Sequence, residues 1–307
     1  MAVAEPIAAP TTASGADRPR RSPRPRRSRP PVPGTGRRGS SFAIYFVALV
    51  LVGMMLAPVA YIILGGFRSN SEITLDPSGL PGEWQWSNYS DVLGSGVFWG
   101  QVGNSAIAAV ATTVFVVALG LMAAFALSRY SFRGRGVVYA VFTAGLMFPM
   151  TVAITPLYIL VRNLGLMNSL AGVIIPQIAF ALPMTIIILV PFLAAIPREL
   201  QEAAAIDGCS RLGFFWRMVV RLAVPGVITV SILAFIGSWN SYMLPLFILN
   251  NEAAYTLPLG TQAFASQYAV DTAKVLAFTS LSMIPALLFF SLFERRIVGG
   301  LTGAVKG

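Results

Sequence analysis

Residues 100–128 read GQVGNSAIAAVATTVFVVALGLMAAFALS, and no Asp, Glu, Lys or Arg interrupts them. A helix of about 20 apolar residues crosses the roughly 30 Å hydrocarbon core of a bilayer. Apolar blocks of the same kind, equally free of charge, occur at residues 42–67, 137–161, 171–196, 222–249 and 275–293. The sequence therefore predicts an all-α integral membrane protein with six transmembrane helices.

The composition narrows the chemistry that the chain can perform. Hydrophobic residues make up 56% of the chain and charged residues 11%, whereas about 25% of an ordinary soluble domain is charged. Histidine is absent and there is one cysteine, Cys209. Zinc sites and His-based acid–base catalysis need those side chains. We therefore expect no metal site, no catalytic residues and no enzyme activity, and a disulfide within the chain is excluded.

A basic segment precedes the first apolar block. Nine of the 22 Lys and Arg residues lie between Arg18 and Arg38, interleaved with Pro, Ser and Gly. Such a composition buries too little apolar surface to fold, so we expect residues 1–39 to form a disordered tail and residues 40–307 to form the membrane domain. Next to a membrane, the net charge of +10 favours anionic lipid as the partner of this tail rather than nucleic acid.

Charges in the connections between the apolar blocks alternate in sign. Residues 68–99 contain one Arg and four acidic residues, whereas residues 129–136 contain three Arg and no acid. Because Lys and Arg gather in cytoplasmic loops, this alternation predicts that both termini lie in the cytoplasm.

The connection after the fourth block, residues 197–208, reads PRELQEAAAIDG. Pro197 suits a first helical turn, and Glu199 and Glu202 are expected to complement the positive end of the helix dipole. The alanines favour a helix, and Gly208 can stop it in a left-handed conformation. We predict a short helix of two to three turns.

The expected helix has small residues at helical spacing. Leu200, Ala203, Ala204 and Asp207 fall at positions i, i+3, i+4 and i+7, which share one face. A second helical run at residues 211–220 then leads into the fifth block. Small side chains on a short helix let the groove of another protein close around it, although a helix lying among lipid headgroups has a similar composition.

The run from Glu202 to Gly208, followed by apolar and basic residues to Pro225, resembles the EAA loop of bacterial ABC-importer permeases, here about residues 197–225. The motifs at residues 86–89, 128–135 and 239–242 resemble the carbohydrate-uptake branch and its maltose-type second permease. In that family the loop forms a cytoplasmic coupling helix, between spans four and five, that docks in a cleft of the ATP-binding subunit. The resemblance implies a coupling contact made by Glu202, Ala203, Ala204, Asp207 and Gly208.

The same resemblance implies the partners of the chain. These are a homologous second permease, a dimer of ATP-binding subunits and an extracytoplasmic solute-binding protein, in a bacterial cell membrane. The sequence contains no Gly-x-x-x-x-Gly-Lys-Ser/Thr motif, so we expect ATP and Mg to bind the ATPase subunit and no cofactor to bind this chain. An ion-coupled secondary carrier is the rival class, disfavoured because carriers place ionisable side chains within their spans.

Candidate contacts with the transported solute lie in the fifth block. Trp239, Asn240 and Tyr242 offer aromatic faces and an amide, which suit a neutral sugar. The same Trp and Tyr serve equally as interfacial anchors, and the Asn as a link between helices. A glycerol-phosphate-type solute is the alternative substrate, because relatives in this branch import such compounds.

Overall fold

The computed structural model describes residues 38–264 and 270–305. The expected disordered tail at residues 1–39 lies almost entirely outside them. The described part is helical and contains no β-strand. Its α-helices are α1 (Arg38–Gly65), α2 (Asn70–Leu75), α3 (Trp86–Gly94), α4 (Gly96–Arg129), α5 (Arg135–Gly145), α6 (Met150–Asn163), α7 (Leu170–Ala194), α8 (Arg198–Ile206), α9 (Arg211–Phe214), α10 (Val220–Leu222), α11 (Val224–Trp239), α12 (Met243–Ile248) and α13 (Thr272–Val305).

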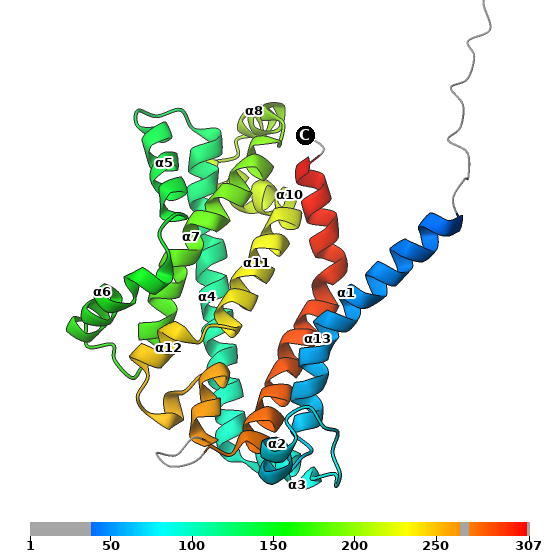
Figure 1. The fold of residues 1–307 in the computed structure, drawn as a ribbon. Helices are drawn as coiled ribbons and strands as arrows, with labels where there is room; N and C mark the ends of the chain where they lie inside the picture. The colour runs from blue at the N-terminus through cyan, green and yellow to red at the C-terminus, as the bar shows by residue number, and fades with distance from the viewer. Residues whose placement is uncertain (1–37, 265–269, 306–307) are drawn as a thin grey trace, which may run out of the picture. The chain divides into compact units, whose positions relative to one another are not determined.

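The chain divides into two parts, residues 1–51 and residues 52–307. The first part contributes the opening turns of α1. In the second part, α4 packs against α7 and α11, and α11 packs against α13. Figure 1 shows α8 at one end of this α4–α7–α11–α13 bundle and α2 with α3 at the other.

Four helices are long and apolar enough to cross a membrane: α1, α4, α7 and α13. These confirm the predicted blocks at 42–67, 100–128, 171–196 and 275–293. Helix α7 continues through three prolines, Pro176, Pro183 and Pro191, which membrane helices tolerate when neighbouring groups satisfy the freed carbonyls. Two bent pairs of helices, α5 with α6 and the run from Arg211 to Leu222 with α11, are also apolar enough, and the total reaches six when each pair counts as one span.

The sequence predicted one continuous helix at residues 137–161, but the structure has two. Helices α5 and α6 meet at an angle of 100° across a short break. Pro149 stands at the break as the N-cap residue of α6, with an extended backbone, φ −72° and ψ 132°. A proline has no N–H to continue the preceding helix and disfavours the α conformation in the residue before it, so α5 ends ahead of Pro149. The turn brings Gly145 against Pro183 of α7, where a β-carbon on the glycine would lie 3.1 Å from the proline Cγ.

The block at 222–249 also departs from the prediction. The helical run expected from residue 211 is present as α9, the π-helical segment η1 (Phe215–Val219) and α10, and it bends by 76° into α11. The bend falls at Ala223, and Pro225 follows in the first turn of α11, where its missing N–H costs least. Helix α11 ends at Trp239, and the short α12 follows separately.

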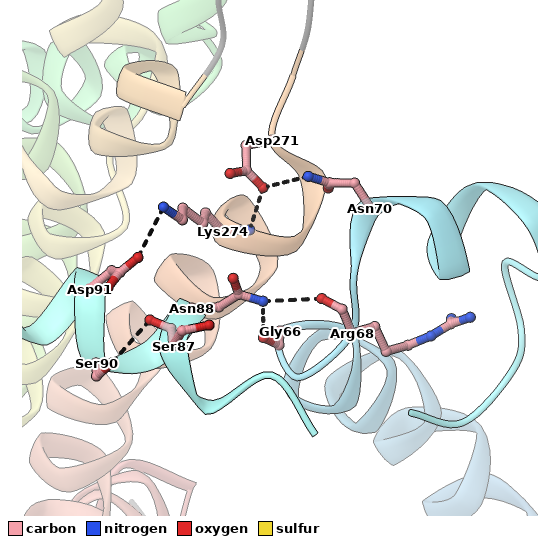
Figure 2. Close-up of polar contacts among 9 residues, drawn as sticks. All are labelled: Gly66, Arg68, Asn70, Ser87, Asn88, Ser90, Asp91, Asp271 and Lys274. Atoms are coloured by element: carbon pink, nitrogen blue, oxygen red, sulfur yellow. Dashed lines mark hydrogen bonds and ion pairs between the residues drawn. The ribbon is translucent and has the colours of Figure 1, made fainter. Parts of the chain in front are cut away.

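Side-chain hydrogen bonds join the elements at the α2–α3 end of the bundle (Figure 2). The Asn88 amide donates to the carbonyl oxygens of Gly66 and Arg68, at 3.0 Å each. The Asn70 amide donates to Asp271 Oδ1 at 2.9 Å, while its oxygen accepts from the N–H of Ala273 at 2.9 Å. Residues some 200 positions apart in sequence are therefore held together, and we call this set the Asn70–Asn88 network.

Candidate functional site

Helix α8 has a defined end at each terminus. Pro197 is its N-cap residue and Glu199 lies in its first turn. At the other end, the N–H of Gly208 donates to the carbonyl of Ala205 at 3.1 Å, and that of Cys209 to Ala204 at 2.8 Å. These two bonds form a Schellman motif, which satisfies carbonyls that a helix end otherwise leaves free. The expected short helix of two to three turns is confirmed.

Gly208 adopts φ +76°, so the left-handed stop expected from the sequence is present. A β-carbon built there would meet no atom within 4 Å. The requirement for glycine therefore comes from the backbone conformation alone, since left-handed geometry costs other L-residues about 1 kcal/mol or more.

The predicted coupling residues do not share one environment. Ala204 is buried, at 7% exposure, in a hydrophobic cluster of this chain, and Leu200 packs beside it. Glu202, Ala203, Asp207 and Gly208 are exposed. The face proposed from helical spacing is therefore split, because α8 uses Leu200 and Ala204 to attach to its own protein.

Glu202 does not lie in the first turn of the helix. It is the fifth residue of α8, counted from Arg198, so among the two glutamates only Glu199 sits where the dipole interaction is strong. The expectation that both acids complement the positive helix end is corrected to Glu199 alone.

Ile206 is a residue that the sequence reasoning missed. Its side chain is 87% exposed at the last position of α8. It lies four residues after Glu202 and two after the buried Ala204, so helical spacing places it away from the attached face. A bulky apolar residue directly after three alanines and before Asp207, on the side away from Leu200 and Ala204, was the signal that could have found it.

A guanidinium fixes the position of α8 relative to α4. Arg129, the last residue of α4, donates from Nη2 to the carbonyl of Ile196 at 2.6 Å. Ile196 lies in the short link between α7 and α8. A charge-assisted bond of this length is stronger than a neutral one, so the link between α7 and α8 is held against the end of α4.

The predicted solute-path residues separate in the structure. Trp239 and Asn240 line a cavity of about 370 Å³ between α11, the 3₁₀ segment η3 (Leu257–Phe264) and α13. Thr261, Thr279 and Ser282 bring hydroxyl groups to it, and no charged residue is among its described lining. Trp239 is 5% exposed and stacks on Phe235 with ring centroids 5.8 Å apart.

Tyr242 does not line that cavity. Its hydroxyl accepts a hydrogen bond from Gln262 Nε2 at 3.0 Å, and its side chain is 37% exposed. The cavity therefore brings together two of the three candidates. Among the described residues, no three His, Cys, Asp or Glu side chains gather closely enough to hold a metal ion.

Comparisons with known proteins agree with this architecture. Residues 116–299 match the family described as binding-protein-dependent transport system inner membrane component. The chain is 34% identical over 263 residues to the diacetylchitobiose uptake system permease NgcG of Streptomyces coelicolor, covering 85% of this chain and 87% of that protein. It is 36% identical over 274 residues to the trehalose transport system permease SugB of Mycobacterium tuberculosis, covering 88% and 100%.

A solved structure has the same fold. A chain in the crystal structure of a bacterial ABC transporter that imports the acidic polysaccharide alginate superposes with a TM-score of 0.73. The match covers 86% of this chain and 99% of that one, at 23% sequence identity. Four to six apolar spans, a capped short helix between α7 and α9, and these matches together identify the chain as a multi-pass member of the binding-protein-dependent transport system inner membrane component family.

Proposed function

We propose that the chain is one of two permease subunits of an ATP-driven importer for a neutral oligosaccharide or disaccharide, and that it performs no catalysis itself. The proposal rests on how α8 is attached to its own chain and on which of its residues are exposed. The helix is attached to its own chain through Leu200 and Ala204, and it presents Glu202, Ala203, Ile206, Asp207 and Gly208 outward. A short, rigidly capped and outward-facing helix suits insertion into the groove of another protein.

In this proposal α8 lies on the cytoplasmic side and docks in a dimer of ATPase subunits that bind ATP and Mg. A homologous permease completes the translocation path, and a solute-binding protein delivers the sugar from outside. Binding of ATP favours one arrangement of the subunits over another, because ATP has different affinities for the two states. The Arg129–Ile196 bond lets a displacement of α8 reach both α4 and α7.

The cavity at Trp239 supports a neutral solute. Aromatic and amide groups with three hydroxyls bind sugar rings by stacking and hydrogen bonding, and the described lining has no cation for a phosphate group. Two relatives are named for neutral sugars, diacetylchitobiose and trehalose, whereas a third, 31% identical, is named for sulfoquinovosyl glycerol, which carries a sulfonate. The cavity lining that the structure describes is uncharged and favours the neutral class for this chain. A glycerol-phosphate-type solute is therefore the weaker candidate.

Ile206→Asp tests the docking of α8. We expect the ATPase subunit to be lost on co-purification and uptake of sugars to stop, because a charge replaces an apolar contact. Leu75→Asp is the matched control, since Leu75 is 86% exposed and lies at the α2 end of the bundle. Retention of the ATPase by the Ile206 variant would refute the assignment and leave the ion-coupled carrier as the alternative.

Thiol labelling tests the proposed orientation. In a Cys209→Ala background, a cysteine placed at Ser78 should react with an impermeant reagent in intact cells, and one at Arg133 should not. The reverse pattern would put α8 on the outside, where no ATPase could reach it.

A further inference from the structure

Three cavities adjoin along one side of α4. The first, about 380 Å³, lies where α4, α8 and α9 meet. The second, about 270 Å³, shares Tyr130 and Arg211 with the first. The third, about 300 Å³, shares Phe215 and Trp216 with the second. Because each shares side chains with the next, the three cavities lie in a row along α4, and we refer to this row as the groove.

The first cavity is strongly basic. Arg129, Arg198 and Arg211 line it, with Glu202 as the acid in its wall. In the part of the chain that the structure describes, no carboxylate lies within ion-pair distance of these guanidinium groups. Arg211 lies over the ring of Tyr130, 5.4 Å from its centroid, and Arg129 Nε is buried there without a hydrogen-bond partner. Three cations against one carboxylate, with no ion pair between them, leave the cavity with a net positive charge that favours an anionic ligand.

The other two cavities are apolar. Met122, Leu212 and Trp216 line the second, and Val114, Ala118 and Val227 line the third. Along α4 the groove runs from Arg129 to Thr113, which is about 24 Å of helix. One leaflet of the hydrocarbon core is about 15 Å thick, so the groove covers the depth of a leaflet and its headgroup region.

We propose that this groove binds one anionic phospholipid. Its phosphate lies among Arg129, Arg198 and Arg211, where guanidinium groups donate paired hydrogen bonds to phosphate oxygens. One of its two acyl chains follows the apolar walls along α4 toward the bilayer centre. Basic pockets between membrane helices bind anionic headgroups by this arrangement, and the apolar extension selects a lipid over free phosphate. Because Arg198 opens α8, the lipid would hold the proposed coupling helix in place whichever solute is carried.

The headgroup is tested on the chain purified with its bound subunits and reconstituted in nanodiscs of phosphatidylcholine, with or without phosphatidylglycerol. Native mass spectrometry should find one retained phosphatidylglycerol. The double variant Arg198→Gln and Arg211→Gln should bind phosphatidylglycerol about 25-fold more weakly than the wild type. Each arginine contributes about 1 kcal/mol, which is about fivefold in affinity. Arg217→Gln with Arg221→Gln is the matched control, because it removes the same charge from exposed positions outside the groove.

Equal loss in both double variants would mean general attraction between charges and would overturn the proposal. Inorganic phosphate added to phosphatidylcholine nanodiscs should leave the unfolding temperature unchanged, whereas phosphatidylglycerol should raise it. Equal stabilisation by free phosphate would overturn the lipid assignment.

The acyl chain is tested separately by filling the groove. Ala118→Trp places a large ring in the third cavity from an exposed position, so the fold should survive. This variant should lower phosphatidylglycerol retention at least tenfold. Leu119→Trp is the matched control and should not lower it, because Leu119 is exposed and does not line the cavity. The proposal would be refuted if Ala118→Trp retained as much phosphatidylglycerol as the wild type. It would also be refuted if the wild type retained no lipid because another subunit fills the groove.

Discussion

The two ends of the α4–α7–α11–α13 bundle satisfy their polar groups in different ways. At the α2–α3 end, the Asn70–Asn88 network and the buried Arg68 form hydrogen bonds within the chain, and Arg68 donates to the carbonyls of Glu72 and Asp76 at 2.8 and 2.6 Å. At the α8 end, three guanidinium groups lack carboxylate partners among the described residues, and Ile206 extends outward.

This difference indicates where the chain needs other molecules. A charged donor that already has acceptors gains little from a further partner, whereas a cation with no acceptor nearby gains more. Arg68 Nε is buried without a partner, but Arg68 Nη2 donates to two carbonyls, so the α2–α3 end has less need of another molecule. We propose that partners pair with the guanidinium groups at the α8 end. Variants at the first should change stability, and variants at the second should change association.

The largest effect is expected for Gly208→Leu. The left-handed backbone there disfavours leucine by about 1 kcal/mol or more, and the added side chain stands on the docking surface proposed for α8. Uptake should fall to near zero with normal amounts of protein in the membrane, measured by transport and immunoblotting. Gly134→Leu is the control, because Gly134 has φ +87° and equally open surroundings. Equal loss of uptake in both would show that backbone strain alone explains the effect.

Asn70→Ala should lower stability and leave ATPase binding intact. It removes two hydrogen bonds and leaves the N–H of Ala273 without its acceptor, which costs about 1–3 kcal/mol. Thermal unfolding in detergent should record a lower midpoint than for Asn163→Ala, an exposed asparagine at the end of α6. Loss of the ATPase with an unchanged midpoint would contradict the division of roles between the two ends.

Lys274→Ala should have a smaller effect. The Lys274 ammonium lies 3.1 Å from Asp91 Oδ2, but the side chains are 33% and 55% exposed. Exposed ion pairs contribute below about 1 kcal/mol and weaken with salt. The difference in unfolding midpoint between wild type and variant should shrink as salt is added, and Lys274→Arg should restore it. A difference that persists at high salt would show that the pair contributes through packing.

The smallest effect concerns Glu72. The backbone N–H of Ser69 donates to its carboxylate at 2.9 Å, and this bond lowers the pKa of Glu72 below its ordinary value. The carboxylate therefore stabilises the fold at neutral pH, and this contribution disappears as the pH falls through the ordinary pKa to the lowered one. Between neutral pH and a pH well below the ordinary glutamate pKa of about 4.3, the unfolding midpoint of the wild type should fall more than that of Glu72→Gln. Parallel curves would show that the capping bond has no electrostatic component.

The features that the sequence predicted correctly are those set by neighbouring residues in the chain. Charge-free blocks predicted the spans, and the alanine run ending at Gly208 predicted α8 with its left-handed stop. The breaks were missed because proline alone does not decide them: α7 passes through three prolines unbroken, while the chain turns by 100° near Pro149. Packing between distant segments differs at these sites, as in the close approach of Gly145 to Pro183, and such packing cannot be read from local sequence. Burial of Ala204 likewise depends on residues distant in sequence, so Ile206 was overlooked.

The prolines of α7 have a mechanical consequence. Each lacks an N–H, so the carbonyls of Gly172, Ala179 and Ile187, four residues earlier, lose their usual donors. Helix α4, its main neighbour, contains no proline. The hydrogen bonds along a helix resist bending, so α7 should bend more easily than α4. The Arg129–Ile196 bond joins the two helices at the end near α8. If α8 is displaced, we expect α7 to bend near its three prolines and α4 to stay straight.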